Sequence, residues 1–420
     1  MKDLCAEIIS VGTEILLGNI TNTDARDVSV ALSELGINVF WHTVVGDNAA
    51  RLSEAVAVAR GRADVIITTG GLGPTYDDMT KQTLSECFGL PLIFHPEQAE
   101  KIRGHFSAMG REMTDNNLAQ AYLPEGCTVL ENHCGTAPGC AFFAQGKHVI
   151  MMPGPPGELR MMLRTGALPY LSSLSDKVLV SHDIKLFGLS ESAIDEIMGD
   201  IMKNSVNPSL APYCATGEVR LRVTARSGDA AEAEAMTRPI IAETEKRLGQ
   251  YIYGIDVDSL EQAAFLGLKK ASLSLSCAES CTGGLIAERI TAIPGASSVF
   301  LGGVAAYSNA VKTGLLGVKP ETLERFGAVS RETAIEMAEG VRALTGSDVA
   351  VSTTGLCGPD SDGSETPVGT VYVALADASG TQCRRLFFPG DRGRCRTLAA
   401  HNAFDMIIKT MQLTEGYARE

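Results

Sequence analysis

The strongest constraint on the fold is the alternation of short apolar runs with amphipathic segments across residues 6–168. Apolar runs and segments with helical spacing follow one another at 8–11, 24–35, 39–45, 49–60, 65–69 and 79–87. This alternation is typical of a parallel sheet with helices on both faces. Ligands of such sheets bind at the carboxyl ends of the strands.

Polar and Gly-rich segments fall at these strand ends, at residues 12–14, 46–48 and 69–78, and further Gly/Pro loops follow at 135–139 and 153–158. Glycine N–H groups of the 69–78 loop can bind a phosphate, and Asp77 with Asp78 can hold a divalent cation. The alternative is a tight turn followed by helix-capping acids. The candidate pocket residues are Glu14, Asp47, Gly70, Gly71, Gly73, Asp77 and Asp78.

Residues 176–255 have a different pattern and predict a small α+β connecting domain. The expected strands are 178–186, 218–224 and 251–253, and the expected helices begin at 191 and 230. The segment contains no convincing nucleophile or metal cluster, so a connecting or dimerising role is expected. Arg220 and Arg222 are interpreted as the solvated face of a strand.

Residues 256–420 predict a third domain, again with layered α/β architecture. Its expected helices are 260–271, 285–291, 310–316, 331–344 and 391–412, and its expected strands are 273–277, 299–307, 349–353, 368–376 and 382–388. The last two strands are expected to form an antiparallel hairpin over Ser379-Gly380.

The first strand of this domain leads into Cys277-Ala278-Glu279-Ser280-Cys281-Thr282-Gly283-Gly284. A serine in a strand-to-helix turn can act as a nucleophile, while N–H groups of residues 281–284 stabilise developing negative charge. The alternative is that Ser280 simply caps the following helix. Cys281 is a rival nucleophile.

A serine nucleophile needs a base, and residues 258–400 contain no histidine, while His401 lies inside the predicted last helix. Lys312 is the candidate among five lysines because it follows the end of the strand expected beside the one carrying Ser280. As a base it requires a pKa about three units below its usual value, which burial can produce. Tyr307 can relay the proton or merely pack, and Lys312 can also be an ordinary surface lysine.

Composition narrows the setting. A net charge of −14 argues against a general nucleic-acid or membrane-surface binder, which needs a basic face. The eleven cysteines are scattered without metal-ligand spacing, and no apolar run of about 18 residues occurs. We therefore expect a cytoplasmic protein that binds small molecules.

The third domain resembles the CinA carboxy-terminal domain. The matching motifs are Ala278–Gly284, Pro294–Ser297, Ala306-Tyr307-Ser308-Asn309 with Lys312, Thr354-Gly355, Pro367–Val371 and Phe388–Arg392. The resemblance implies an amidohydrolase that deamidates nicotinamide mononucleotide without a cofactor, with Ser280 as nucleophile, Lys312 as base and Tyr307 assisting. The expected substrate-binding residues are Cys281, Thr282, Gly283, Gly284, Thr354, Gly355 and Arg392.

The first domain resembles the other half of the CinA family, whose fold is related to molybdopterin-binding proteins. The motifs are Gly12–Glu14, Asn22-Thr23, Val45–Asp47, Thr69–Thr75, Asp77-Asp78 and Gly135–Gly139. The resemblance implies hydrolysis of ADP-ribose with Mg, Mn or Co, here held by Asp77 and Asp78. It also implies a homodimer.

Two departures from the family pattern stand out. Leu118 and Ala119 replace a basic residue before Gln120, which weakens the case for pyrophosphatase activity, and Leu356-Cys357-Gly358-Pro359-Asp360 replaces the usual loop after Thr354-Gly355. The sequence thus predicts domains at 1–170, 176–255 and 256–420, the outer two being three-layer α/β folds. It predicts a bifunctional enzyme of pyridine-nucleotide salvage. The alternatives are an inactive or molybdopterin-binding first domain and an interaction protein related to competence or DNA damage.

Overall fold

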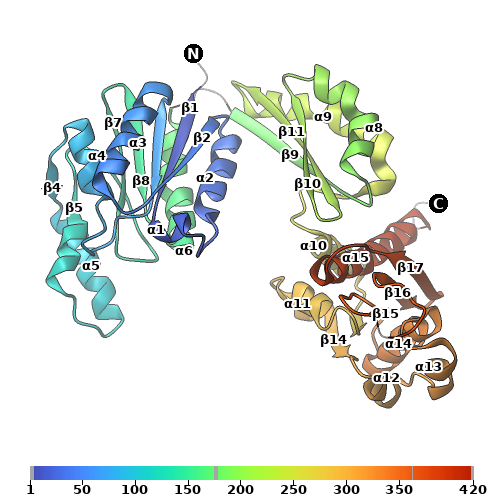
Figure 1. Ribbon diagram of the computed structural model, residues 1–420. Helices are drawn as coiled ribbons and strands as arrows, with labels where there is room; N and C mark the ends of the chain where they lie inside the picture. Colours follow the sequence, from blue (N-terminus) through green and yellow to red (C-terminus); the bar gives the residue numbers. More distant parts are fainter. Residues whose placement is uncertain (1–3, 175–177, 362, 418–420) are drawn as a thin grey trace. The chain divides into compact units, whose positions relative to one another are not determined.

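The computed structural model describes residues 4–174, 178–361 and 363–417 (Figure 1). The chain forms two compact units, 1–180 with 225–235 and 181–224 with 236–420. The predicted start of the middle domain, residue 176, lies outside the described residues. Among the helices that are described, none is both long and apolar enough to cross a membrane.

The first unit contains a six-stranded sheet in the order β2-β1-β3-β8-β7-β6. The strands are β1 (Cys5–Val11), β2 (Asn38–Val45), β3 (Val65–Thr69), β6 (Thr128–Leu130), β7 (Gly139–Ala144) and β8 (Lys147–Met152). Strands β2, β1, β3 and β8 are parallel, whereas β7 and β6 are antiparallel additions. The prediction of a parallel sheet is therefore right for the four strands that carry the Gly-rich loops and wrong for one edge.

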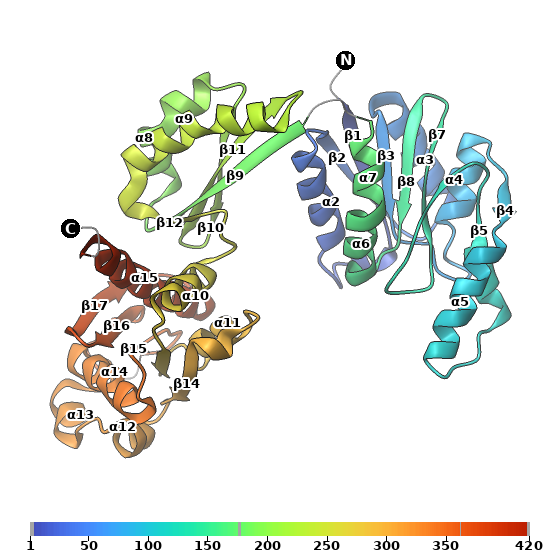
Figure 2. The same ribbon diagram turned by 180° about the vertical axis from the view of Figure 1, so that it is seen from behind.

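Alternate strand residues face two separate cores, which places helices on both faces of this sheet (Figure 2). Ile8 packs with α2 (Thr23–Glu34), α6 (Pro156–Met162) and α7 (Leu168–Ser172). Ile9 packs with α3 (Ala49–Arg62) and α4 (Thr80–Phe88). This is the period-two alternation expected of a strand buried on both sides.

Short elements complete the first unit. They are α1 (Thr13–Leu16), β4 (Leu92–Phe94), α5 (Pro96–Ala108), η1 (Asp115–Ala121), β5 (Tyr122–Pro124) and η2 (Leu163–Ala167). Strands β4 and β5 form their own antiparallel pair. Helix α1 and η1 matter for function because each contributes residues to the pocket described below.

The middle domain has the element order of a split β-α-β fold. It consists of β9 (Val178–Phe187), α8 (Glu191–Asn204), β10 (Ser209–Ala215), β11 (Glu218–Ser227), α9 (Ala230–Leu248), η3 (Gly249–Tyr251) and β12 (Ile252–Ile255), with strand order β10-β11-β9-β12. The sequence does not reveal β10, an edge strand that contains Pro212. Arg220 and Arg222 lie on the less buried face of β11, as expected, and both guanidinium groups also bind Asp183.

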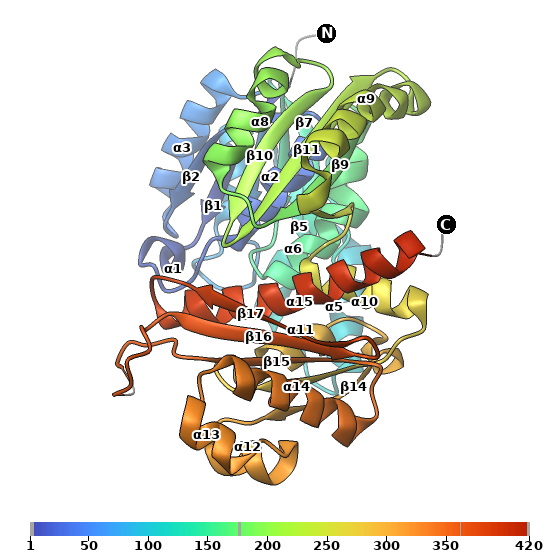
Figure 3. The same cartoon turned by 90° about the vertical axis from the view of Figure 1, so that its right-hand side faces the viewer.

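The third domain has a five-stranded sheet in the order β14-β13-β15-β16-β17 (Figure 3). Its elements are α10 (Leu260–Ala271), β13 (Leu275–Glu279), α11 (Leu285–Thr291), η4 (Ala296–Ser298), β14 (Phe300–Ala305), α12 (Asn309–Leu316), α13 (Pro320–Phe326), α14 (Arg331–Thr345), β15 (Val349–Gly355), β16 (Thr370–Asp377), β17 (Gly380–Phe387) and α15 (Arg392–Tyr417). The predicted hairpin is confirmed as the antiparallel β16–β17 pair, and α13 was not predicted.

Helices cover both faces of this sheet as well. Helices α10, α11 and α15 pack on one face with Leu275 and Cys277, while α12 and α14 pack on the other with Ala278 and Ala350. Strand β13 is parallel to both neighbours, β14 and β15. The residues that follow β13 and β14 therefore meet at one sheet edge.

Replacement of Gly340 by alanine tests the packing of α14 on α12. The added Cβ would lie 1.8 Å from the Leu316 carbonyl oxygen, so we expect Gly340→Ala to destabilise the third domain by about 1–3 kcal/mol despite alanine's better helix propensity. The control is Gly314→Ala in α12, where a Cβ meets nothing within 4 Å. This control should stabilise the domain by about 0.5–1 kcal/mol. Calorimetric unfolding of both variants measures the effects, and a stabilising Gly340→Ala would contradict the described packing.

Candidate functional site

Ser280 follows β13 directly, and its neighbour Glu279, the last residue of β13, binds the start of the next helix. The buried Glu279 carboxylate accepts hydrogen bonds from the N–H groups of Gly284, Ile286 and Ala287 at 3.0, 3.0 and 2.9 Å. Helix α11 has Gly284 at its N-cap position and no capping serine. The interpretation of Ser280 as a helix cap is therefore wrong, and its hydroxyl is left for another role.

That hydroxyl lies against Lys312. The Lys312 Nζ donates to Ser280 Oγ at 3.0 Å and to the Ala306 carbonyl oxygen at 2.8 Å. Ser308 caps α12 through the Val311 N–H, which places Lys312 in the first turn of this helix beside the end of β14. Lys312 is 1% exposed, so it is not a surface lysine.

Burial also changes the protonation of this lysine. Loss of hydration disfavours the ammonium form, so the pKa of Lys312 is lowered from 10.5. Neither hydrogen-bond partner carries a negative charge, and the nearby Cys281 opposes the lowering of the pKa only in part. A lysine with a lowered pKa beside a serine hydroxyl is the arrangement that proton transfer from serine requires.

Tyr307 and Arg392 are brought together at the same edge. Arg392 donates one N–H to the Tyr307 hydroxyl at 2.7 Å and another to the Gly358 carbonyl oxygen at 2.8 Å. Tyr307 is 65% exposed. The Tyr307 hydroxyl is hydrogen-bonded to Arg392 and not to Lys312. This arrangement favours a position of the Tyr307–Arg392 pair that faces the substrate.

Several other predicted binding residues have their polar groups engaged inside the domain. The Thr354 hydroxyl is buried and donates to the Ala328 carbonyl oxygen, and the backbone of Gly355 pairs with Val371 in the sheet. The Gly284 N–H is bound by Glu279. The expectation that the Thr354 hydroxyl and the Gly284 N–H bind substrate is thus not supported by these contacts.

Thr282 and Cys281 also face the interior. Thr282 is buried, with its hydroxyl 2.7 Å from that of Thr353, and its carbonyl oxygen accepts from Arg396. Cys281 is 6% exposed in the core cluster that also contains Cys357 and Cys395. The thiol of Cys281 is therefore packed in the core, while Ser280 faces Lys312. Gly283 has a left-handed backbone, at φ +59°, within the same turn.

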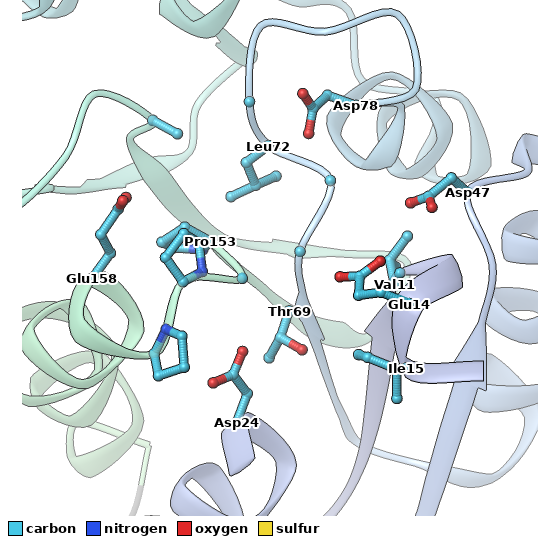
Figure 4. A pocket seen from close by; sticks show the side chains of 18 of the residues that line it. Val11, Glu14, Ile15, Asp24, Asp47, Thr69, Leu72, Asp78, Pro153 and Glu158 are labelled. Atoms are coloured by element: carbon cyan, nitrogen blue, oxygen red, sulfur yellow. The ribbon is translucent and has the colours of Figure 1, made fainter. Parts of the chain in front are cut away.

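The first unit contains a cavity of about 570 Å³ at the carboxyl ends of β1, β2, β3 and β8 (Figure 4). It is lined by all seven predicted residues: Glu14, Asp47, Gly70, Gly71, Gly73, Asp77 and Asp78. Residues of the two Gly/Pro loops, including Thr136 and Pro153, complete the wall. The structure therefore brings the predicted pocket residues together at one edge of the sheet.

Hydrogen bonds hold the acidic side chains of this cavity in place. The Thr75 N–H donates to Asp78 at 2.8 Å, and the Thr75 hydroxyl lies against both Asp77 and Asp78. Asp47 accepts from the N–H of Thr13 at 2.9 Å at the start of α1. The two candidate metal ligands thus converge on Thr75.

The glycines of the loop are needed for its own packing. Gly70 has φ +93°, and a Cβ there would lie 2.2 Å from the Val11 carbonyl oxygen. The Gly70 N–H donates to the Met152 carbonyl oxygen. It is therefore not available to a phosphate, contrary to the expectation from the sequence. A Cβ at Gly71 would lie 2.2 Å from the Thr80 hydroxyl oxygen. Close approach of neighbouring segments therefore requires both glycines.

The carboxylates of this cavity can supply only some of the ligands of a Mg²⁺-like ion. No group of three or more His, Cys, Asp or Glu side chains positioned for a metal occurs among the described residues. Mg²⁺ is commonly held by one or two carboxylates together with substrate phosphates and water. Asp77 and Asp78 are the two carboxylates predicted for this role.

Sequence reasoning missed two buried charged residues near this cavity. Lys81 donates to the carbonyl oxygens of Ala119 and Gln120, and burial lowers its pKa to about 8. The segment that lacks the family's basic residue therefore does contact a cation, supplied by α4. Asp24, a cavity residue, was missed because an acid in the first helical turn is ordinary.

His401 is buried in α15, and burial lowers its pKa to about 4. Its ring packs edge-on against Phe187 of the middle domain. Its expected structural role agrees with this position, and it has no recorded contact with Ser280.

The fold and the two sites define a class of protein in which a serine–lysine domain and a Gly-rich pocket domain flank a small α+β domain. Three families match in order: "Probable molybdopterin binding domain" at residues 7–173, "Damage-inducible protein CinA KH domain" at 181–254 and "CinA C-terminal domain" at 257–411. The chain belongs to the CinA family.

Full-length relatives support this membership. The "Putative competence-damage inducible protein" of Acetivibrio thermocellus is 46% identical over 411 residues, covering 98% of this chain and all of the relative. The "CinA-like protein" of Kosmotoga olearia is 46% identical over 406 residues, covering 97% of this chain and 98% of the relative.

Solved structures resemble single parts of the chain. A CinA protein of unknown function from Thermoplasma acidophilum is 34% identical, with a TM-score of 0.37, and covers 40% of this chain and 98% of its own. A competence or damage-inducible protein from Enterobacter asburiae is 30% identical, with a TM-score of 0.36, and covers 37% of this chain and 99% of its own.

Removal of the Glu279 carboxylate tests how the serine turn is held. Glu279→Ala leaves three N–H groups without their acceptor, so we expect a loss of about 3–5 kcal/mol in unfolding free energy of the third domain. The exposed Glu288 of the same helix provides the control, because Glu288→Ala should change stability by less than about 0.5 kcal/mol. Thermal unfolding compares the variants. Equal stability of the two would show that Glu279 does not organise the turn.

Proposed function

We propose that the third domain hydrolyses the carboxamide of nicotinamide mononucleotide to nicotinate mononucleotide and ammonia. The observation that carries this proposal is the buried Lys312 Nζ at 3.0 Å from Ser280 Oγ. Serine activated by a neutral lysine suits acyl transfer from an amide. We choose nicotinamide mononucleotide as the substrate because these positions resemble the family's amidohydrolase motif.

The reaction follows from the roles of these groups. Neutral Lys312 takes the Ser280 proton while Oγ bonds to the carboxamide carbon. The Lys312 ammonium group then gives that proton to the carboxamide nitrogen, which leaves as ammonia when the C–N bond breaks. Backbone N–H groups of residues 281–283, in the turn between β13 and α11, are the donors that we assign to the oxyanion. Water then attacks the acyl carbon while Lys312 takes its proton. The ester bond breaks as Lys312 returns the proton to Ser280 Oγ, which frees Ser280.

The exposed edge of this site suits the remainder of the substrate. Arg392 and Tyr307 are joined by a hydrogen bond and lie at the ends of α15 and β14. A guanidinium group is a natural partner for the 5′-phosphate. We therefore assign the phosphate to Arg392 rather than to Thr354, whose hydroxyl is occupied.

For the first domain we propose metal-dependent hydrolysis of ADP-ribose to AMP and ribose 5-phosphate. This proposal is supported by the glycine loops, Asp77 and Asp78, which all line the same cavity. A bound Mg²⁺, Mn²⁺ or Co²⁺ would lower the charge repulsion at the pyrophosphate and assist an attacking water. Asp77 and Asp78 would hold it.

Two other functions would use the same features. The relatives' names refer to competence and damage, which suits an interaction protein, and the match to a molybdopterin-binding family suits a pterin ligand in the first domain. The buried lysine disfavours a purely non-catalytic third domain, because an interaction surface has no use for a costly buried amine. Binding assays with molybdopterin and ADP-ribose separate the two ligands of the first domain.

Substitutions in the third domain test the deamidase. Ser280→Ala and Lys312→Ala should each reduce ammonia release from nicotinamide mononucleotide by at least about 10³-fold, because the nucleophile or its base is lost. The control Cys281→Ala should retain activity, since the thiol is packed in the core. Loss of activity in the cysteine variant alone would overturn the assignment of the nucleophile.

The pH dependence of deamidation tests the base. Only neutral Lys312 can accept the Ser280 proton, so kcat/KM should rise with pH through the lysine pKa, and that limb should lie below pH 10.5 because burial lowers the pKa. Steady-state ammonia assays across the alkaline range measure the limb. A rate that falls as pH rises through this range would exclude lysine as the base.

Metal removal and Asp78→Ala test the first domain. With Mg²⁺, Mn²⁺ or Co²⁺ we expect AMP release from ADP-ribose, and chelation by EDTA or loss of the Asp78 carboxylate should reduce it by about 10²-fold or more. Glu97→Gln, an exposed substitution in α5, is the control. Absence of AMP with all three metals would remove this half of the proposed function.

A further inference from the structure

One carboxyl group in the first-domain cavity lacks the partner that its burial demands. Asp24 lines the cavity and is 8% exposed, and its Oδ1 is buried with no hydrogen-bond partner among the described residues. In Figure 4 its side chain points towards the cavity below Thr69, from a different element than Asp47 and Asp78. A buried polar atom without a partner is costly, which makes it informative when it borders a ligand cavity.

The ordinary structural role of an acid at this position is already filled. Asp24 lies in the first turn of α2, where an acidic side chain often caps the helix. Here the Asn22 side chain caps the helix by accepting from the Ala25 N–H at 3.1 Å. Asp24 is therefore not required as the cap of α2.

The charged neighbours do not neutralise Asp24 either. Arg160 of α6 gives its recorded hydrogen bond to Asp27, at 2.6 Å, and Asp27 also binds Arg26. Glu158, also on α6, lines the same cavity and adds negative charge. The pKa of Asp24 is raised to about 6. Burial is the main cause, the charge of Asp27 adds to the rise, and Arg160 partly opposes both.

We propose that Asp24 is a specificity-determining residue that binds a vicinal ribose diol of the nucleotide in this cavity. The inference rests on the proposed nucleotide-hydrolysing function of the first domain. An ionised carboxylate can accept from two adjacent hydroxyl groups, and carboxylates recognise ribose in this way in other α/β nucleotide sites. Asp78, with the glycine loop, lies elsewhere in the cavity wall, where we assign the metal ion and the phosphates.

A hydroxyl-bearing ligand fits Asp24 better than a metal ion does. Hard cations gather several oxygen ligands, whereas Asp78, one of the two carboxylates proposed to hold the metal, lies at a different part of the cavity wall from Asp24. Thr69 and Pro153, the cavity residues near Asp24 in Figure 4, are uncharged. A diol supplies the donors that this surrounding lacks without bringing a net charge into it.

The test compares ribose and deoxyribose ligands on the full chain. Calorimetric titration gives the affinity for AMP and 2′-deoxy-AMP, and for ribose 5-phosphate and 2-deoxyribose 5-phosphate, at pH 8 and pH 5. Wild-type protein should prefer the ribose form of one pair by about tenfold or more at pH 8, since the bonds are to a charged acceptor. The preference should shrink at pH 5, because Asp24 is then protonated. The ratio within a pair cancels titration of the phosphate.

Asp24→Asn should reduce that preference about tenfold and remove its pH dependence, whereas the exposed control Glu34→Gln, on the same helix, should change neither. An unchanged preference in Asp24→Asn overturns the assignment of Asp24 alone. Absence of ADP-ribose or AMP binding by wild-type protein instead refutes the proposed function of the domain. If Asp24→Asn abolishes the Mg²⁺ dependence of binding, Asp24 is a metal ligand and the diol assignment is wrong.

Stability gives an independent readout. The folded-state pKa of Asp24 is raised from 3.8 to about 6, so its ionisation weakens the fold as pH rises through this window. Asp24→Asn should therefore raise the melting temperature of the ligand-free first domain at pH 7.5 and have no such effect at pH 4. A lower melting temperature at pH 7.5 would show that the carboxylate is structural and overturn the proposal.

Discussion

Both outer domains depend on the same constraint: a parallel strand that ends at the carboxyl edge of a sheet leads into a helix whose first N–H groups lack partners. In the third domain the buried Glu279 carboxylate satisfies three of them, which fixes the turn and leaves Ser280 uninvolved in capping. In the first domain Asn22 and Asn48 cap the corresponding helices. Once other side chains have met this demand, the polar groups beside the caps are available for ligands and chemistry.

The serine–lysine pair shows how the surrounding structure sets chemistry. Lys312 reaches Ser280 because Ser308 starts α12 next to the end of β14, and β14 pairs with the strand that precedes Ser280. Packing of α14 against α12 holds this arrangement from behind, with Gly340 allowing the close approach. The lysine receives two neutral acceptors and no carboxylate. Its environment therefore favours the neutral amine, the form that a base needs.

Much of this arrangement was predictable because it follows from local pattern. The periodicity predicted α10 and α11 with the bounds observed, and counting histidines and lysines directed attention to Lys312. The missed features depend on contacts between distant segments. In the sequence Glu279 is an ordinary residue of the turn after the expected strand, and its contacts form only when the helix folds over it. The Thr354 hydroxyl is not available to substrate because it donates to Ala328, 26 residues away. Lys81 meets residues 119 and 120 only after η1 folds against α4.

Lys312 and Asp24 pose the same physical question with opposite charges. Each is almost fully buried, each has a pKa moved towards the neutral form by loss of hydration, and Arg160, the cation near Asp24, is bound by Asp27. A side chain selected for stability alone would be apolar or ion-paired at such a position, because an uncompensated buried charge weakens the fold. For Lys312 the serine hydroxyl explains the cost. For Asp24 no residue in the part of the chain that the structure describes explains the cost, and the cavity beside it is the place where a compensating donor can enter.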